Sequence, residues 1–295
     1  LSKAPLLRVK LVKLEEEKHI LMIDMHHIIS DGISIGIIMK EFTKLYKGER
    51  LEELRLNYKD YATWQNELLD SEDMEQFGKY WTGVFSNEIP VLDMPTDYQR
   101  PTFQSFEGES IEFKIDKKLT ENIRKIGTAY GATMYMTLLS AYNILLSKYS
   151  RQEDIIVGSP IAGRSHADLQ GIVGMFVNTL VMRNYPKGEK TFKEFLHDVK
   201  ENALSAYENQ EYQFDKLIEE LDIRRDLSRN ALFDTMFVLQ NIDIKELKID
   251  NLKFKQYDFE NKISKFDITL SATEIGEEIA FNMEDRKSTR LNSSH

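Results

Sequence analysis

Strand-length apolar runs alternate with segments of helical period along this chain, and that alternation restricts the possible folds more than any other feature. The runs from Leu6 to Val12 and from His19 to Met25 flank a charged turn and predict a hairpin. Further strands are expected at 110–115, 155–161, 176–182, 233–239, 266–271 and 279–283. Helices are expected at 35–45, 51–69, 75–85, 119–130, 133–149 and 192–207. The predicted class is therefore α/β with mixed sheets.

Charge and composition exclude several classes of function. The chain has 49 acidic and 39 basic residues, and the net charge of −10 disfavours nucleic acid as a partner. It contains no cysteine, which excludes a disulfide framework and a cysteine nucleophile and fits a cytoplasmic location. Apolar runs such as Ile20 to Met25 are far shorter than the roughly 20 residues of a membrane span.

Both ends of the sequence indicate a segment of a longer polypeptide. Leu1 opens the chain without an initiator methionine or a signal-peptide pattern. Residues 287–295, KSTRLNSSH, are polar and aperiodic, are expected to be disordered, and resemble a translated sequencing adapter.

The string HHIISDG, residues 26–32, has the clearest chemical potential and follows the second predicted strand. Neighbouring strand residues point to opposite faces, so alternation places His27 on the side of Met25 and His26 on the other. Asp31 is expected either to cap the next helix or to form half of an ion pair. An unprotonated imidazole can accept a proton or a hydrogen bond from an amine, which is the chemistry of acyl transfer.

Two other interpretations of the histidine pair are open. A pair of hydrogen-bonded core histidines is the commoner outcome for an arbitrary HH sequence. A metal site has less support, because zinc sites use three or four ligands. The remaining histidines show no ligand-like spacing with this pair: His19, His166, His197 and His295.

Several motifs together resemble a known family. HHIISDG is similar to the HHxxxDG signature of the condensation domains of nonribosomal peptide synthetases, which belong to the chloramphenicol acetyltransferase superfamily. Four further motifs follow in the family's order: YKDYATW at 58–64, IVGMFVNTLVMR at 172–183, NQEYQFD at 209–215 and RDLSRNAL at 225–232. The connecting segments PTDYQRP at 95–101 and VGSPIAGR at 157–164 agree as well. The resemblance extends from about Leu1 to Asp285, nearly the whole chain.

The resemblance implies two chloramphenicol acetyltransferase-like lobes in a V-shaped pseudodimer. The N-terminal lobe, residues 1–97, carries the histidines and is incomplete, because the family's first two motifs are absent. The proline-rich stretch 90–101 marks its end, and residues 98–286 form the C-terminal lobe. Smaller departures from the family are Ile33 in place of the common Trp, and Gln213 and Ala231 in place of Pro.

The resemblance also implies roles for single residues. His27 is the functional histidine, which either deprotonates the acceptor amine or positions it, and His26 is mainly structural. Asp31 corresponds to the family's structural acid, with Arg225 as its predicted partner and a plain helix cap as the alternative. Gly32 is expected to present its backbone N–H toward the thioester oxygen.

Other residues are assigned to support or to packing. Ser30 and Asn178 are placed in the substrate channel or its structural support, and for Asn178 a β-bulge or turn amide is the alternative. Tyr61, Trp64 and Phe214 are expected to pack in the core rather than to contact substrate.

In this family, a donor acyl or peptidyl thioester and an acceptor aminoacyl thioester arrive on the phosphopantetheine arms of carrier proteins and are joined by an amide bond. No cofactor or metal is expected to bind directly. The expected partners are upstream and downstream peptidyl carrier protein domains and an adjacent adenylation domain, with no nucleic acid and no membrane.

Three alternatives stay open: an epimerisation domain, a free-standing acyltransferase using coenzyme A, and an inert module that docks carrier proteins. The motifs at 209–215 and 225–232 favour condensation over epimerisation.

Overall fold

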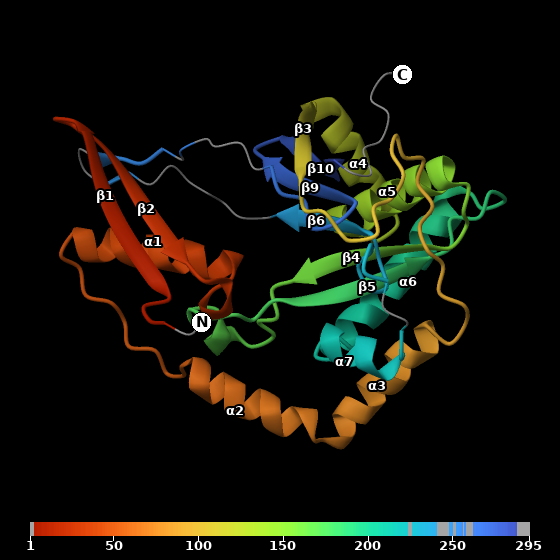
Figure 1. The fold of residues 1–295 in the computed structure, drawn as a ribbon, viewed down its shortest axis with the longest axis horizontal. Coiled ribbons are helices and arrows are strands. Elements are labelled where there is room, and N and C mark those ends of the chain that lie inside the picture. Colours follow the sequence, from red (N-terminus) through yellow and green to blue (C-terminus); the bar gives the residue numbers. More distant parts are fainter. Residues whose placement is uncertain are drawn as a thin grey trace. The chain divides into compact units, whose positions relative to one another are not determined.

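The order of elements in the computed structural model follows the predicted alternation of strands and helices, which confirms the mixed α/β class. The structure describes residues 3–223, 226–240, 248–249, 252–255, 257 and 262–287. These residues pack as two compact units, and Figure 1 shows their elements coloured along the chain. Each unit gathers segments that lie far apart in the sequence.

The first unit contains the histidine motif and comprises the described parts of Leu1–Asp70, Ala162–Val177 and Ile242–Gln256. Its strands β1 (Leu7–Glu15) and β2 (Lys18–Met25) form the predicted antiparallel hairpin, with Val9 opposite Ile23. Cross-strand partners share a face, so one face of this hairpin is apolar. Its short elements are η1 (His27–Ile29), η2 (Ala167–Leu169), β7 (Lys248–Ile249) and β8 (Leu252–Lys253).

Two helices of the first unit begin at side-chain caps. Helix α1 (Gly32–Tyr46) starts after Asp31, whose carboxylate accepts a hydrogen bond from the third residue of the helix. Helix α2 (Tyr58–Leu69) starts after Asn57, which forms a capping box with Asp60. This box explains why α2 begins at Tyr58 rather than at the predicted residue 51.

The second unit is built on a six-stranded sheet in the order β3-β10-β9-β6-β4-β5. Pairing is parallel between β4 and β6 and between β6 and β9, and antiparallel elsewhere. Its strands are β3 (Gly108–Ile115), β4 (Ile155–Ile161), β5 (Asn178–Asn184), β6 (Thr235–Gln240), β9 (Ile268–Ile275) and β10 (Glu278–Arg286). Its helices are α3 (Glu72–Val84), α4 (Lys117–Ala129), α5 (Met134–Ser150), α6 (Phe192–Glu208) and α7 (Phe214–Glu220).

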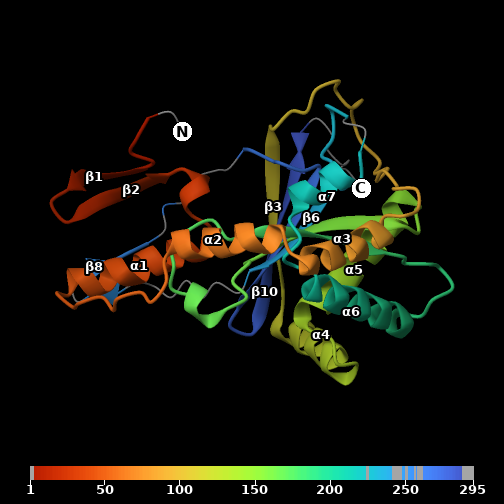
Figure 2. The same cartoon turned by 90° about the horizontal axis from the view of Figure 1, so that it is seen from below.

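The core of the second unit lies between this sheet and its helices. Helices α4, α5 and α6 pack side by side along the sheet (Figure 2). The central strands read as nearly continuous apolar runs, and Ile155, Val157 and Phe237 are 0% exposed. Leu139 of α5 and Leu196 of α6 are 0% exposed as well, so burial of apolar surface holds sheet and helices together.

The compact units do not end at the predicted boundary. The stretch from Ser71 to Asp97 belongs to the second unit, and Ala162–Val177 belongs to the first. The assignment of residues 1–97 and 98–286 to two family lobes stays a prediction.

Lys287 was placed in a disordered tail, but its N–H donates to the Glu107 carbonyl at 2.8 Å, and residues 288–295 lie outside the described residues. In the described part of the chain, no helix has the length and apolar character needed to cross a membrane.

Candidate active site

The strand that leads to the histidine motif ends at Met25, one residue before the first histidine. His26 has an extended backbone, and its Nδ1 accepts a hydrogen bond from the Ile28 N–H at 3.1 Å. His26 therefore caps the single 3₁₀ turn η1. The strand ends at Met25, so the alternation of strand faces does not extend to His27. His27 lies in a turn and not in the strand geometry predicted for it.

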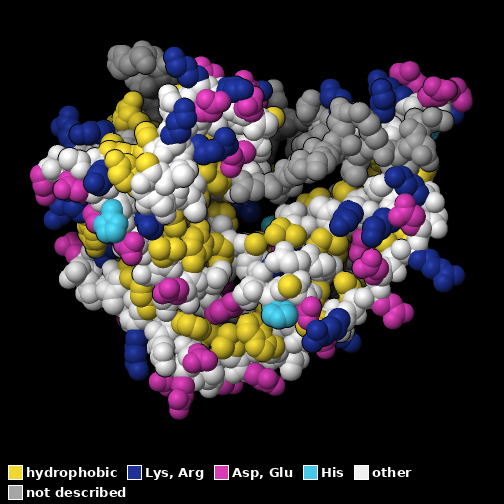
Figure 3. Space-filling view, turned by 180° about the vertical axis from the view of Figure 1, so that it is seen from behind, with side chains coloured by type: hydrophobic (Ala, Val, Ile, Leu, Met, Phe, Trp, Pro, Cys, Tyr) yellow, Lys and Arg dark blue, Asp and Glu magenta, His cyan; other side chains and the backbone are white. Residues whose placement is uncertain are grey.

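His27 lies at the surface, at the first position of this turn. It is exposed, and its carbonyl accepts a hydrogen bond from the Ser30 N–H at 3.1 Å. Every histidine in the described ranges is exposed, and histidine side chains are visible in cyan at the surface in Figure 3. The alternative of a buried core pair was therefore wrong. The described residues also contain no group of three or more histidine or acidic side chains that could hold a metal ion.

Asp31 is buried, in contrast to His27, with 1% of its side chain exposed. Its Oδ1 accepts a hydrogen bond from the Ser34 N–H at 2.7 Å and caps α1 as predicted. Its Oδ2 accepts one from the Phe176 N–H at 3.2 Å. This carboxylate thus joins the start of α1 to residues 162–177, which we call the 162–177 segment.

Arg164 of the 162–177 segment is the ionic partner of Asp31. Its Nη2 lies 3.1 Å from Oδ1 and 3.2 Å from Oδ2, and its side chain is 0% exposed. Its Nη1 donates to the carbonyls of Leu169 and Ile172, both at 2.6 Å, and its guanidinium carbon lies 4.0 Å from the centre of the Phe176 ring. The cap and the ion pair expected as alternatives for Asp31 are therefore present together.

Arg225 was the predicted partner of Asp31, and Arg164 was not predicted. Arg225 lies outside the described residues, and the structure gives the role to Arg164. The chain reaches that position through Gly163, which has φ of +61° and whose added Cβ would lie 1.9 Å from the Phe176 carbonyl oxygen. Only glycine fits both conditions. The sequence signal that could have identified Arg164 was its place directly after Gly163, close to the end of the predicted strand 155–161.

The electrostatics of the site favour an ionised Asp31. Burial raises the pKa of this carboxyl, but hydrogen bonds from Ser34, the charge of Arg164 and the Phe176 N–H together outweigh burial. The pKa of Asp31 therefore lies below its ordinary value. Because the buried Asp31 carboxylate has this many partners, it is held in one geometry. It therefore fixes the end of the turn that carries His27.

Two further residues of the motif have distinct surroundings. Gly32 is exposed and begins α1. The first N–H groups of a helix have no acceptor within the helix, so that of Gly32 can serve an external oxygen. Ser30, which was assigned to the channel or its support, is 5% exposed between η1 and α1.

The YKDYATW motif packs against the 162–177 segment. The predicted core role of Tyr61 is confirmed, because it is 5% exposed and belongs to a cluster with Leu169, Ile172 and Phe176. Its ring centre lies 4.5 Å from that of Phe176. Trp64 packs on Tyr61 at 5.8 Å but is 43% exposed, so the core position predicted for it was wrong.

Asn178 belongs to the second unit, where it begins β5. Its Nδ2 donates to the carbonyls of Gln210 at 2.9 Å and Tyr212 at 2.8 Å. Its Oδ1 accepts from the N–H groups of Thr179 at 2.8 Å and Phe214 at 3.3 Å. The amide is engaged at both ends by backbone, which favours the turn-amide alternative over a channel contact.

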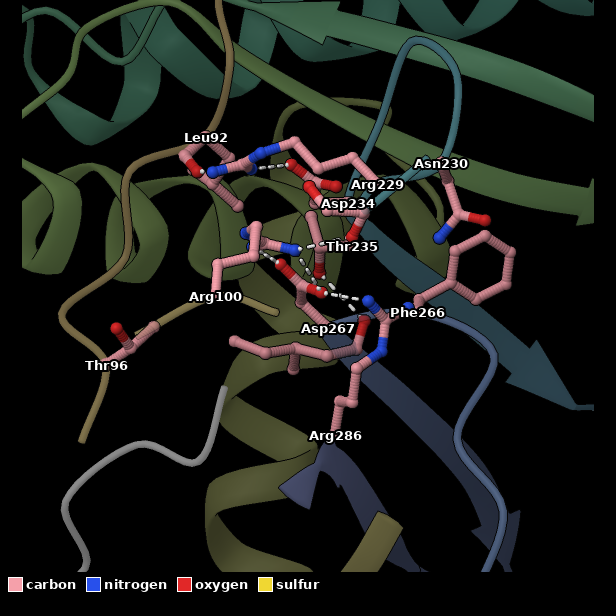
Figure 4. Close-up of polar contacts among 12 residues, drawn as sticks. Leu92, Thr96, Arg100, Arg229, Asn230, Asp234, Thr235, Phe266, Asp267 and Arg286 are labelled. Atoms are coloured by element: carbon pink, nitrogen blue, oxygen red, sulfur yellow. Dashed lines mark hydrogen bonds and ion pairs between the residues drawn. The ribbon is translucent and has the colours of Figure 1, made fainter. Parts of the chain in front are cut away.

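The RDLSRNAL motif leads into a cluster of ion pairs in the second unit (Figure 4). Arg229 pairs with Asp234, and Arg100 pairs with Asp267, whose Oδ1 also lies 2.9 Å from Arg286 Nη1. Burial raises the pKa of Asp234, and the neighbouring Asp267 raises it further. The cluster ties the loop before β6 to the end of β10, which gives the motif a structural role.

A pocket of ≈ 740 Å³ lies beside this cluster within the second unit. Phe214 lines it together with Arg229 and Asp234. Phe214 is half-buried and packs on Phe233 with ring centres 5.5 Å apart, so its predicted core role holds only in part.

Comparison with known protein families and curated proteins gives consistent matches. The family model described as "Condensation domain" matches residues 1–289. Gramicidin S synthase 2 of Brevibacillus brevis is 57% identical over 286 residues, which are 96% of this chain and 6% of that protein. Bacitracin synthase 3 of Bacillus licheniformis is 55% identical over 284 residues, 96% of this chain and 4% of that protein. The chain thus spans a small part of the length of these relatives.

Solved structures share the fold at low sequence identity. A four-domain nonribosomal peptide synthetase, AB3403, bound to AMP and glycine, matches 99% of this chain and 23% of its own with a TM-score of 0.88 at 20% identity. The X-domain from teicoplanin biosynthesis matches 99% of this chain and 69% of its own with a TM-score of 0.88, also at 20% identity.

Proposed function

Because this chain belongs to the condensation-domain family of nonribosomal peptide synthetases, we propose that it catalyses amide bond formation between a donor acyl or peptidyl thioester and an acceptor aminoacyl thioester. The observation that carries the proposal is the exposed His27, set on a turn whose two ends are fixed by the His26 cap and the buried Asp31. A thioester is already activated, so the catalyst contributes mainly proximity and orientation.

The proposed reaction is addition of the acceptor's α-amine to the thioester carbonyl carbon. A carbon–nitrogen bond forms, the carbon–sulfur bond breaks, and the donor carrier's thiol leaves. His27 accepts the amine proton or holds the amine by a hydrogen bond, and an α-amine is already partly unprotonated near neutral pH. The Gly32 N–H at the start of α1 stabilises negative charge on the thioester oxygen in the transition state.

The other site residues act in support of His27 in this proposal. His26 and Asp31 hold the turn, Ser30 fills the space between η1 and α1, and Arg164 takes the role predicted for Arg225. Asn178 shapes the backbone between β5 and α7 rather than touching substrate.

The partners in this proposal are an upstream and a downstream peptidyl carrier protein domain, each bearing a phosphopantetheine arm, and an adjacent adenylation domain. Support comes from the relatives, which are peptide synthases far longer than this chain. No metal or nucleotide takes part in the proposed chemistry, and the proposed location is the cytoplasm.

Epimerisation is the competing activity for this motif, and product analysis separates the two. The protein that contains this chain is supplied with an aminoacyl donor carrier and an aminoacyl acceptor carrier in D₂O. Condensation moves the donor acyl group onto the acceptor amine and leaves the Cα hydrogens in place. Epimerisation inverts Cα on the same carrier and introduces deuterium there. Deuterium at Cα without an amide product would refute the proposed activity.

A further inference from the structure

The hydroxyl of Ser34 lies where helix α1 meets the 162–177 segment. Ser34 is 0% exposed and is the third residue of α1. Its Oγ lies 2.7 Å from Asp31 Oδ1, 2.9 Å from the Gly174 carbonyl oxygen, 3.1 Å from the Gly174 nitrogen and 3.2 Å from Arg164 Nη2. One buried hydroxyl therefore touches both members of the Asp31–Arg164 pair and both polar groups of Gly174.

These four contacts use the full hydrogen-bonding capacity of a hydroxyl. A serine has one hydrogen to donate and two lone pairs that accept. The hydrogen is shared between Asp31 Oδ1 and the Gly174 carbonyl, and the lone pairs accept from the Gly174 N–H and from Arg164 Nη2. An alanine at this position would leave these buried groups without that partner.

Gly174 is itself held in place by the YKDYATW motif. A Cβ at Gly174 would lie 2.1 Å from the Tyr58 ring, so the ring packs directly on the backbone there. The Tyr58 hydroxyl also donates to the Met175 carbonyl at 2.7 Å. Contacts thus run from α2 through Gly174 and Ser34 to Asp31, and Asp31 ends the turn that carries His27.

We propose that Ser34 is a positioning residue, which sets the place of the His27 turn by fixing Asp31 and the 162–177 segment in one geometry. Its consequence for catalysis rests on the proposed function, because it acts through His27. Its consequence for the position of His27 does not, and the two are measured separately.

The structural arm uses NMR on the chain labelled with ¹³C and ¹⁵N at its histidines. The His27 signals are assigned by their loss in His27→Gln. The control is Thr43→Ala, because Thr43 lies on the same helix and its hydroxyl bonds only the Met39 carbonyl, at 2.8 Å, among the described residues. Ser34→Ala should shift and broaden the His27 backbone and ring signals, and Thr43→Ala should leave them in place.

Tyr58→Phe is a second variant, which removes one hydroxyl from the same chain of contacts and preserves the ring. It should move the His27 signals in the same direction by a smaller amount, and it serves as the test if Ser34→Ala does not fold. His27 signals unmoved in the folded Ser34→Ala protein, or moved equally by Thr43→Ala, would overturn the proposal. If Ser34→Ala does not fold, unmoved signals in Tyr58→Phe would overturn it.

The activity arm measures amide formation in the protein that contains this chain. Ser34→Ala should lower kcat by roughly 10- to 100-fold with little change in KM for the acceptor, because misplacement of a catalytic group affects the chemical step. Unchanged kcat with displaced His27 signals would overturn the catalytic part. A wild-type protein that forms no amide would count against the proposed function and leave the positioning of His27 by Ser34 standing.

Discussion

Asp31 and Arg164 are 133 residues apart in the chain, and they form an ion pair at 3.1 Å with side chains that are 1% and 0% exposed. The carboxylate also caps α1, and the guanidinium also satisfies two carbonyls of the 162–177 segment. Removing both charges from water is costly, so this pair is stable only because nearly every polar atom of the two groups is engaged. The histidine turn is anchored to this pair.

Breaking the pair should destabilise the protein strongly. Arg164→Met leaves Asp31 buried without its counter-charge, so the free energy of unfolding should fall by about 3–5 kcal/mol. Urea denaturation followed by circular dichroism measures this. The control is Arg55→Ala, which breaks a pair with Asp168 at 3.3 Å in which Arg55 is 81% exposed, and it should cost less than about 1 kcal/mol. Equal losses in the two variants would contradict the role given to Arg164.

The stabilisation from Asp31 should depend on pH in a defined direction. Its pKa in the folded protein is lowered, so the unfolded chain binds its proton more readily, and acid favours unfolding. Its contribution is complete above the ordinary aspartate pKa of 3.8 and is lost as the pH falls through the folded value. The difference in unfolding free energy between wild type and Asp31→Asn should be constant above that pH and should shrink below it. A difference that grows in acid would show the opposite shift.

Gly163 should tolerate alanine less well than a glycine of the same backbone conformation. Gly163 and Gly276 both have φ of +61°, but a Cβ meets the Phe176 carbonyl oxygen at Gly163 and nothing within 4 Å at Gly276. Gly276→Ala should cost about 1–2 kcal/mol for the left-handed conformation alone. Gly163→Ala should cost a further ~1–3 kcal/mol for the steric conflict. Similar melting temperatures for the two variants would refute the close approach.

Much of this fold could be predicted from local pattern. The hairpin, helix α1 and the strands of the second unit lie close to where their apolar periodicity places them. Roles that depend on neighbouring residues could be predicted as well, such as the helix cap formed by Asp31. Strand alternation misled for His27 because it applies only while the strand continues, and β2 ends at Met25.

Long-range pairing was the part that local pattern could not supply. Arg225 was predicted as the partner of Asp31 and Arg164 was not, because spacing in one sequence does not show which arginine reaches a given acid. The first unit combines Leu1–Asp70 with Ala162–Val177, and only the folded chain brings them together. Ser34 went unnoticed for the same reason, since three of its four contacts come from the 162–177 segment.

Asn178 should behave as a structural residue. Asn178→Asp replaces the donor to the Gln210 and Tyr212 carbonyls with an acceptor and should lower the free energy of unfolding by about 1–3 kcal/mol. The matched control is Asn230→Asp, which loses one exposed hydrogen bond of 3.1 Å to the Lys265 carbonyl and should cost less than about 1 kcal/mol. If thermal denaturation shows no loss for Asn178→Asp but amide formation fails, the residue contacts substrate instead.

The most direct test of the account is the rate of amide formation after removal of the His27 imidazole. The protein that contains this chain is given preloaded donor and acceptor carriers, and single-turnover product is followed by mass spectrometry. His19→Ala is the control, because His19 is also exposed and lies on β2 away from the turn. We expect His27→Ala to lower the rate by roughly 10²–10⁴-fold and His19→Ala to leave it unchanged. A His27→Ala protein that forms the amide at the wild-type rate would contradict it.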